Sequence, residues 1–222
     1  MSAALAGLSS MATKHLLAEL AAEYESKTGT PVSVTSMGGV DAAARVRAGE
    51  GCDFVVLAKD AIAKLEAEGH VAGTRTDIAH ASIAVAVPAA APAPDLSTED
   101  AVRDAVMNAR AVGYSTGPSG VHLLRVFERW GVKPRLVQAP PGIGVGELIR
   151  RGEVTLGFQQ LSELIHLDGI RLAGALPAAI QSVTTFCGAV CASSARHDEA
   201  RAFLASIASG DRDAWRRHGL QA

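Results

Sequence analysis

The stretch Cys52-Asp53-Phe54-Val55-Val56-Leu57-Ala58 decides the fold class of this chain. Its apolar run is continuous rather than alternating, which predicts a strand buried on both faces, as in a parallel sheet. Residues 59–68 follow as a predicted helix, and Gly69 ends it. A buried strand followed at once by a helix is the repeating unit of an α/β fold with a mainly parallel sheet.

The same alternation of short strands and helices continues along the rest of the chain. We expect strands at residues 3–8, 32–35, 52–57, 83–87, 111–114, 136–139, 154–158 and 183–192. Helices are expected at residues 10–26, 40–48, 59–68, 98–109, 121–130, 145–151, 161–167, 196–209 and 212–218, with Ser97 as the cap of the fourth. A chain of 222 residues is long enough for one large domain or for two small lobes, each with a core.

Composition excludes several classes of protein. The formal net charge is −2 and no run of Lys or Arg occurs, so we expect no nucleic-acid partner. The richest apolar stretch, residues 83–94, contains three prolines and falls short of the roughly 20 residues that cross a bilayer, so no membrane span is expected. The first ten residues carry no basic segment and no long apolar segment, which predicts a cytoplasmic protein as written, or a periplasmic one if the true start lies upstream.

The three cysteines predict neither a disulfide framework nor a metal site. Cys52, Cys187 and Cys191 are odd in number and form no CxxC motif. Cys187 and Cys191 lie four residues apart in an expected strand, about 13 Å at the usual rise, which is too far for a bond. We expect small buried thiols, no metal and no cofactor.

Hydroxyl and glycine residues follow three of the expected strands, in each case just before an expected helix. Hydroxyls and backbone N–H groups at helix N-termini favour anions, and ligands of open α/β sheets gather at the carboxyl ends of strands. The same residue types also cap helices and form turns without binding anything, so both interpretations stay open. The ligand-binding candidates from these loops are Ser9, Ser10, Ser36, Gly38, Gly39, Ser115, Thr116 and Ser119.

Four short motifs, spread over nearly the whole chain, resemble the periplasmic molybdate-binding proteins of ABC importers. They are Leu8-Ser9-Ser10-Met11, Ser36-Met37-Gly38-Gly39, the stretch 52–58 quoted above, and Gly157-Phe158-Gln159-Gln160-Leu161-Ser162-Glu163. The resemblance implies a two-lobed, type II periplasmic-binding-protein-like α/β fold with a ligand cleft between the lobes. Lobe one would comprise residues 1–80 and 180–222, and lobe two residues 81–179.

The last of these motifs departs from the resemblance in an informative way. Some relatives place a Tyr near the ligand there, whereas this chain offers carboxamides and a hydroxyl. Such groups bind planar carboxylates as well as tetrahedral oxyanions. Gln160 and Ser162 therefore join the ligand-binding candidates, and the expected ligand is a small anion of either kind.

Aconitate isomerase looks like a member of the same superfamily that has become an enzyme. Such an enzyme moves a double bond by taking a proton from one carbon and returning one to another, which needs a base and hydrogen-bond donors. Each titratable candidate also has a structural interpretation, as a helix-start acid, a surface pair or a packing residue. The catalytic candidates are Glu163, His166 and Tyr114, with His122, Lys14 and His15 as weaker ones.

Two functions follow as hypotheses. The first is a solute-binding protein for a small anion, with an ABC importer as partner if an export signal precedes this start. The alternative is a cytoplasmic isomerase that shifts a double bond in an unsaturated di- or tricarboxylate by proton transfer. Whether the chain is an enzyme stays open at this point.

Overall fold

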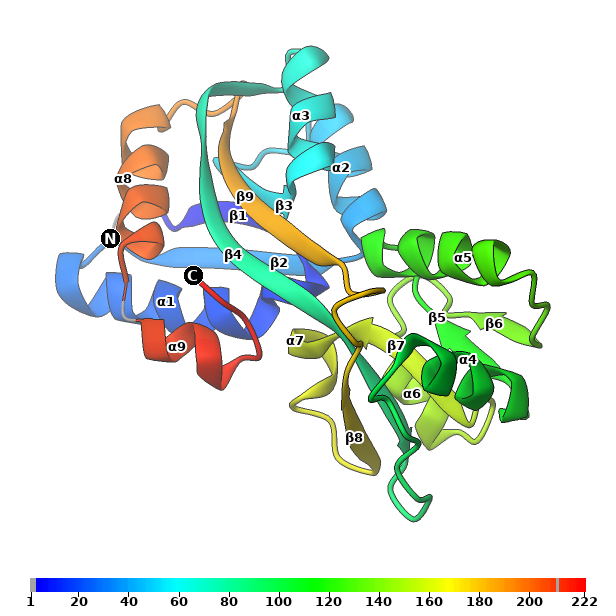
Figure 1. The fold of residues 1–222 in the computed structure, drawn as a ribbon. Helices are drawn as coiled ribbons and strands as arrows, with labels where there is room; N and C mark the ends of the chain where they lie inside the picture. Colours follow the sequence, from blue (N-terminus) through cyan, green and yellow to red (C-terminus); the bar gives the residue numbers. More distant parts are fainter. Residues whose placement is uncertain (1–2, 211) are drawn as a thin grey trace. The chain divides into compact units, whose positions relative to one another are not determined.

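The computed structural model describes residues 3–210 and 212–222, which form two compact α/β units (Figure 1). Unit 1 comprises the described residues up to His80 and those from Thr185 onward, and unit 2 comprises Ala81–Thr184. The division into lobes expected from the sequence, with boundaries at residues 80 and 180, stays a prediction. Residues 1 and 2, which it assigns to lobe one, lie outside the described residues. Over the described residues, none of the helices has the length and apolar character that crossing a bilayer demands.

Unit 1 is a mixed sheet with helices on both faces. Its sheet order is β2-β1-β3-β9-β4, with β1 parallel to β2 and β3, and β9 antiparallel to β3. In Figure 1, α2 and α3 lie on one side of this sheet and α1, α8 and α9 on the other. The elements are β1 (Leu5–Ser10), the 3-10 turn η1 (Met11–Thr13), α1 (Lys14–Thr28), β2 (Val32–Met37), α2 (Gly39–Arg47), β3 (Phe54–Ala58), α3 (Lys59–Ala67), the first part of β4 (Val71–Pro88), β9 (Val183–Cys191), α8 (His197–Ala208) and α9 (Arg212–Arg217).

Aromatic packing through a glycine fixes the centre of unit 1. The Phe54 ring lies 4.9 Å from the Phe203 ring of α8, centroid to centroid, and both side chains are fully buried. A Cβ atom on Gly7 of β1 would lie 2.2 Å from the Phe54 ring, so only glycine leaves room for it. The expected buried strand around Phe54 is thereby confirmed. The first long helix ends at Thr28, two residues later than expected, and Gly29 follows it with φ +71°.

Unit 2 repeats this architecture with a smaller sheet. Its order is β4-β7-β5-β6, with β5 parallel to both β6 and β7, and β4 antiparallel to β7 and to the additional strand β8. Apolar side chains of α4 and α5 cover one face, and those of α6 and α7 cover the other. The elements are the second part of β4, α4 (Glu99–Asn108), β5 (Val112–Tyr114), α5 (Pro118–Trp130), β6 (Leu136–Gln138), α6 (Val145–Arg150), β7 (Leu156–Gln160), α7 (Leu161–Leu164) and β8 (Ile170–Ala175).

The structure corrects the expected elements at five points. β4 begins at Val71 rather than at residue 83. No sequence signal marks the earlier start, because several positions in the first half of the strand are exposed and it carries no apolar run. Strand β8 was not expected, and the antiparallel pairs make the sheet mixed rather than mainly parallel. Thr98, and not Ser97, caps α4 by accepting a hydrogen bond from Ala101 N at 3.1 Å. α7 ends at Leu164 rather than at residue 167.

Candidate functional site

Two serines of unit 1 meet at the carboxyl ends of neighbouring parallel strands. Ser9 of β1 and Ser36 of β2 are register partners, and their Oγ atoms lie 2.8 Å apart. Ser9 is fully buried, whereas Ser36 is partly exposed. Ser36 also lines a hollow of about 380 Å³ on unit 1 together with Lys14, whose ammonium group favours an anion there. The structure therefore brings together two of the serines that the sequence singles out.

The other candidates of unit 1 lie at the helix starts beside this pair. Ser10 caps η1, since its Oγ accepts a hydrogen bond from Ala12 N at 3.4 Å. Gly38 is the N-cap residue of α2 and Gly39 is its first residue. The Asp41 carboxylate lies near Gly38, where a Cβ atom would be 3.1 Å from Asp41 Oδ2. That negative charge disfavours an anion at the start of α2, so the Ser9–Ser36 pair is the stronger donor group of unit 1.

A second hydroxyl pair lies in unit 2, just after β5. Ser115 Oγ and Ser119 Oγ are 2.9 Å apart, and Ser115 Oγ also accepts a hydrogen bond from Gly117 N at 3.3 Å. Ser119 is buried, whereas Ser115 is partly exposed and Thr116 is exposed. A Cβ atom on Gly120 would lie 1.8 Å from Ser115 O, so the glycine permits this tight turn into α5.

The end of β7 lies at the same edge of the sheet of unit 2, because β7 and β5 are parallel. Ser162, in the first turn of α7, is 3% exposed, and among the described residues its Oγ has no hydrogen-bond partner. A buried hydroxyl without a partner is costly, and a ligand acceptor would satisfy it. The Gln160 amide instead serves unit 2 itself: its nitrogen faces Ala81 O at 3.2 Å and its oxygen accepts from Thr184 Oγ1 at 2.9 Å.

Glu163 is the one candidate base with a strongly perturbed carboxyl group. Gln159 Nε2 donates to Glu163 Oε2 at 2.6 Å, and Gln159 Oε1 accepts from Val145 N, the first residue of α6, at 2.7 Å. Loss of solvation raises the pKa of Glu163 to about 7, although the Gln159 hydrogen bond works in the opposite direction. A carboxyl group with this pKa can both take up and release a proton near neutral pH. Gln159 was not among the candidates predicted from the sequence. A polar residue at a buried position of a strand is the signal that could have identified it.

The remaining catalytic candidates have structural contacts or lie at the surface. His122 Nε2 contacts Ile180 O at 2.8 Å, and the Tyr114 ring packs beside Gly120. The spacing of three residues would place His166 and Glu163 on one face of a helix, but His166 is exposed and lies beyond the end of α7, so the two share no helix face. His15 is exposed on α1 and stacks on His218 at 6.2 Å. Over residues 3–210 and 212–222, no three His, Cys, Asp or Glu side chains are grouped as metal ligands.

Comparisons with known proteins agree with this architecture. Residues 5–221 match the model of the family described as bacterial extracellular solute-binding protein. The chain is 37% identical over 217 residues to aconitate isomerase from Pseudomonas sp, covering 92% of this chain and 82% of that protein. Both resemblances drawn from the sequence, to molybdate-binding proteins and to aconitate isomerase, are confirmed.

Two solved structures share the fold at low sequence identity. The periplasmic molybdate-binding protein of Azotobacter vinelandii superposes with a TM-score of 0.78 at 19% identity, covering 98% of this chain and 99% of that one. The tungstate ABC transporter structure from Geobacter sulfurreducens gives 0.73 at 18% identity, covering 96% of each chain. These likenesses establish the type II periplasmic-binding-protein fold class. The family model, which matches residues 5–221, shows that the chain belongs to the bacterial extracellular solute-binding protein family.

Proposed function

We propose that this chain binds a small anion through the hydroxyl groups at the strand ends of its two units. The observation that carries the proposal is the make-up of the two serine pairs, each of which joins a buried hydroxyl to a partly exposed one. When the buried Ser119 donates to Ser115, the Ser115 hydrogen is left for an outside acceptor. Ser9 Oγ lies within hydrogen-bond distance of both Ser36 Oγ at 2.8 Å and Ser10 O at 3.3 Å, and its donation to Ser36 leaves the Ser36 hydrogen for such an acceptor as well. An anion offers acceptors only, so it suits such donors.

A small carboxylate is the ligand class that we favour. The relative at 37% identity is named for an isomerase of aconitate, a tricarboxylate, whereas the molybdate and tungstate proteins support only the fold. Serine hydroxyls, the unpartnered Ser162 Oγ and the ammonium group of Lys14 suit carboxylate oxygens. Tetrahedral oxyanions are the alternative ligand class.

Thermal unfolding with a panel of anions tests the ligand class. The panel contains molybdate, tungstate, sulfate, phosphate, citrate, and cis- and trans-aconitate. A ligand at a hundred times its Kd adds about 2.7 kcal/mol of stability, which raises Tm by roughly 5–10 °C. We expect this rise with a tricarboxylate, and a rise with the tetrahedral oxyanions alone would refute the carboxylate assignment.

Glu163 favours a second candidate function, the isomerisation of an unsaturated tricarboxylate. The carboxylate would take a proton from the CH₂ carbon next to the double bond, and the electron pair would spread over the three-carbon allylic system. The proton on the Glu163 carboxyl would exchange with solvent, the carboxyl would give a proton to the far carbon of that system, and the double bond would shift by one position. Nothing is consumed, and Glu163 ends as it began. A base with a pKa of about 7 suits both halves of this exchange.

Proton NMR in heavy water separates the two candidates. The isomerase hypothesis predicts that cis-aconitate converts to the trans form, that deuterium enters the CH₂ position, and that Glu163→Gln abolishes both. The matched control is Glu147→Gln, which removes a carboxylate paired with Arg150 and Arg151 on the same unit. A ligand that binds tightly with neither turnover nor exchange would refute the isomerase and leave the binding proposal standing.

Partner and compartment depend on which candidate holds. For a binding protein, we propose delivery to an ABC importer outside the cytoplasm, which is supported by the family's description as extracellular solute-binding proteins. An isomerase requires no such partner.

A further inference from the structure

Two cysteines far apart in the sequence meet inside unit 1. Cys52 lies just before β3 and Cys191, 139 residues further along the chain, is the last residue of β9. Their Sγ atoms are 2.9 Å apart, and the side chains are 5% and 1% exposed. Both are free thiols in this structure. Two sulfur atoms this close need only a small side-chain adjustment to reach bonding distance, about 2 Å.

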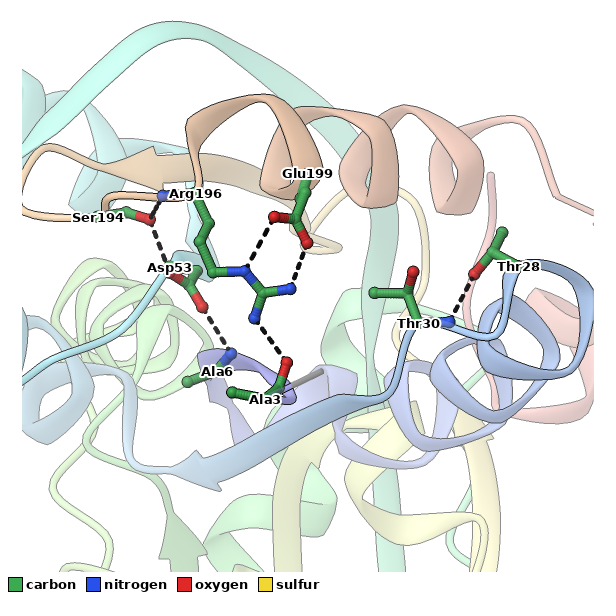
Figure 2. A network of polar contacts seen from close by, with 8 residues as sticks. All are labelled: Ala3, Ala6, Thr28, Thr30, Asp53, Ser194, Arg196 and Glu199. Carbon is green, nitrogen blue, oxygen red and sulfur yellow. Dashed lines mark hydrogen bonds and ion pairs between the residues drawn. The ribbon is translucent and has the colours of Figure 1, made fainter. Parts of the chain in front are cut away.

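The backbone around the pair is held firmly in place. Cys191 N donates to Asp53 O at 3.0 Å, and Asp53 N donates to Ala6 O at 2.7 Å. The Asp53 carboxylate accepts hydrogen bonds from Ala6 N at 2.9 Å and from Ser194 Oγ at 2.6 Å, as Figure 2 shows. Arg196 N extends this network by donating to Ser194 Oγ at 2.9 Å. The residues that follow each cysteine are therefore tied to one another, which keeps the two sulfur atoms in contact.

We propose that Cys52 and Cys191 form a disulfide that joins the two chain segments of unit 1. Unit 1 is assembled from residues on either side of unit 2, and the two cysteines lie one in each segment. A bond between them would enclose all of unit 2 within one covalent loop. The segment that carries β9, α8 and α9 would then be fastened to the segment that carries β1 and β3.

The oxidation is a thiol–disulfide exchange with a small disulfide such as oxidised glutathione. The Cys52 thiolate attacks one sulfur of the oxidant, forms a mixed disulfide and releases the first thiolate. Cys191 then attacks the Cys52 sulfur and releases the second thiolate. The two cysteine protons go to the released thiolates, so one oxidant disulfide is reduced for each disulfide formed. Proteins of a family described as extracellular are found in compartments where such oxidants persist.

Hydrogen bonds and burial give the three cysteines different thiol pKa values and therefore different roles. The hydrogen bond from Cys191 lowers the pKa of Cys52, which favours Cys52 as the attacking thiolate. Cys187 instead donates to Asp77 Oδ1 at 2.9 Å, and burial together with that carboxylate raises its pKa to about 12. Cys187 is buried on β9, the strand that also carries Cys191, so Cys187→Ser is a matched control for Cys191→Ser.

The test equilibrates the full chain with oxidised glutathione, counts its thiols under denaturing conditions and maps its peptides by mass spectrometry. We expect one reactive thiol out of three, a cross-linked pair of peptides containing Cys52 and Cys191, and a Tm that falls by roughly 10 °C on reduction. Cys187→Ser should keep the cross-link and the Tm difference, whereas Cys52→Ser and Cys191→Ser should lose both.

Three outcomes would overturn the proposal. They are three reactive thiols after oxidation, a glutathione adduct on Cys52 that Cys191 does not displace, and a cross-link that includes Cys187. The thiol count and the peptide map use the unmodified chain, so the result stands even if a serine variant does not fold.

Discussion

Replacing Glu163 with Gln should change how the stability of the protein depends on pH. The carboxyl group has a pKa of about 7 in the folded chain and 4.5 as its ordinary value. As pH rises between these two values, the unfolded chain ionises while the folded chain stays protonated, so the folded state loses stability. Below the ordinary value both states are protonated and no penalty arises. Glutamine does not ionise, and its side-chain oxygen can still accept the hydrogen bond from Gln159.

The size of the effect follows from the difference in pKa. The difference between a pKa of about 7 in the folded chain and 4.5 in the unfolded chain corresponds to about 3 kcal/mol once both states are ionised, of which about 2.5 kcal/mol develops between about pH 5 and about pH 8. Relative to Glu163→Gln, the unmodified chain should lose that amount of unfolding free energy across this range. A smaller loss would mean that water reaches the carboxyl group more freely.

Urea unfolding of both proteins at several pH values is the assay. Subtracting the variant from the unmodified chain cancels the contribution of the groups that the two proteins share, the seven histidines among them. Glu147→Gln is the control, because Arg151 and Arg150 lower the pKa of Glu147 and so place its contribution below the tested range. Parallel stability curves for the unmodified chain and Glu163→Gln would refute the argument that burial keeps this carboxyl group protonated.

Three further predictions concern single positions. Gly120→Ala should destabilise unit 2 by about 3 kcal/mol, measured by urea unfolding, because its Cβ atom would strike Ser115 O; normal stability would contradict the tight turn. Trp215→Phe removes the hydrogen bond from Nε1 to Ile78 O at 2.6 Å and should cost about 1–3 kcal/mol in thermal unfolding, and an unchanged Tm would show that the bond contributes little. Ser162→Ala should leave the ligand-free protein equally stable or up to about 1 kcal/mol more stable, because the buried hydroxyl has no described partner. The same variant should bind the anion about tenfold more weakly in a calorimetric titration, and an unchanged affinity would show that Ser162 is not part of the site.

Local sequence signals were sufficient for most of the fold. The continuous apolar run around Phe54 marks a strand buried on both faces, and Gly69 follows the end of α3 with positive φ, as expected. The first half of β4 escaped prediction because its exposed positions are polar and its strand form depends on pairing within the sheet. β8 is half exposed and pairs with β4 alone, so its sequence carries little signal.

Contacts in the candidate site were likewise predictable where local sequence determines them, and not where they depend on the arrangement of other segments. Ser9 and Ser36 were predictable, because the carboxyl ends of parallel strands share one edge, and their Oγ atoms do meet. The contact between Gln159 and Glu163 spans four residues but depends on a bend between β7 and α7. Cys52 and Cys191 meet only because β3 and β9 pair in antiparallel register, which neither residue's neighbours reveal.

Calorimetric titration tests whether serine hydroxyls at the strand ends hold a small anion. The unmodified chain is titrated with trans-aconitate, citrate and molybdate, and then compared with Ser36→Ala and Ser115→Ala. Ser206→Ala, an exposed position on α8, is the matched control. We expect saturable binding of a tricarboxylate, with an affinity that falls roughly 10–100-fold in each site variant and is unchanged in the control. No saturable binding of any of the three anions, or equal affinity in all four proteins, would contradict this expectation.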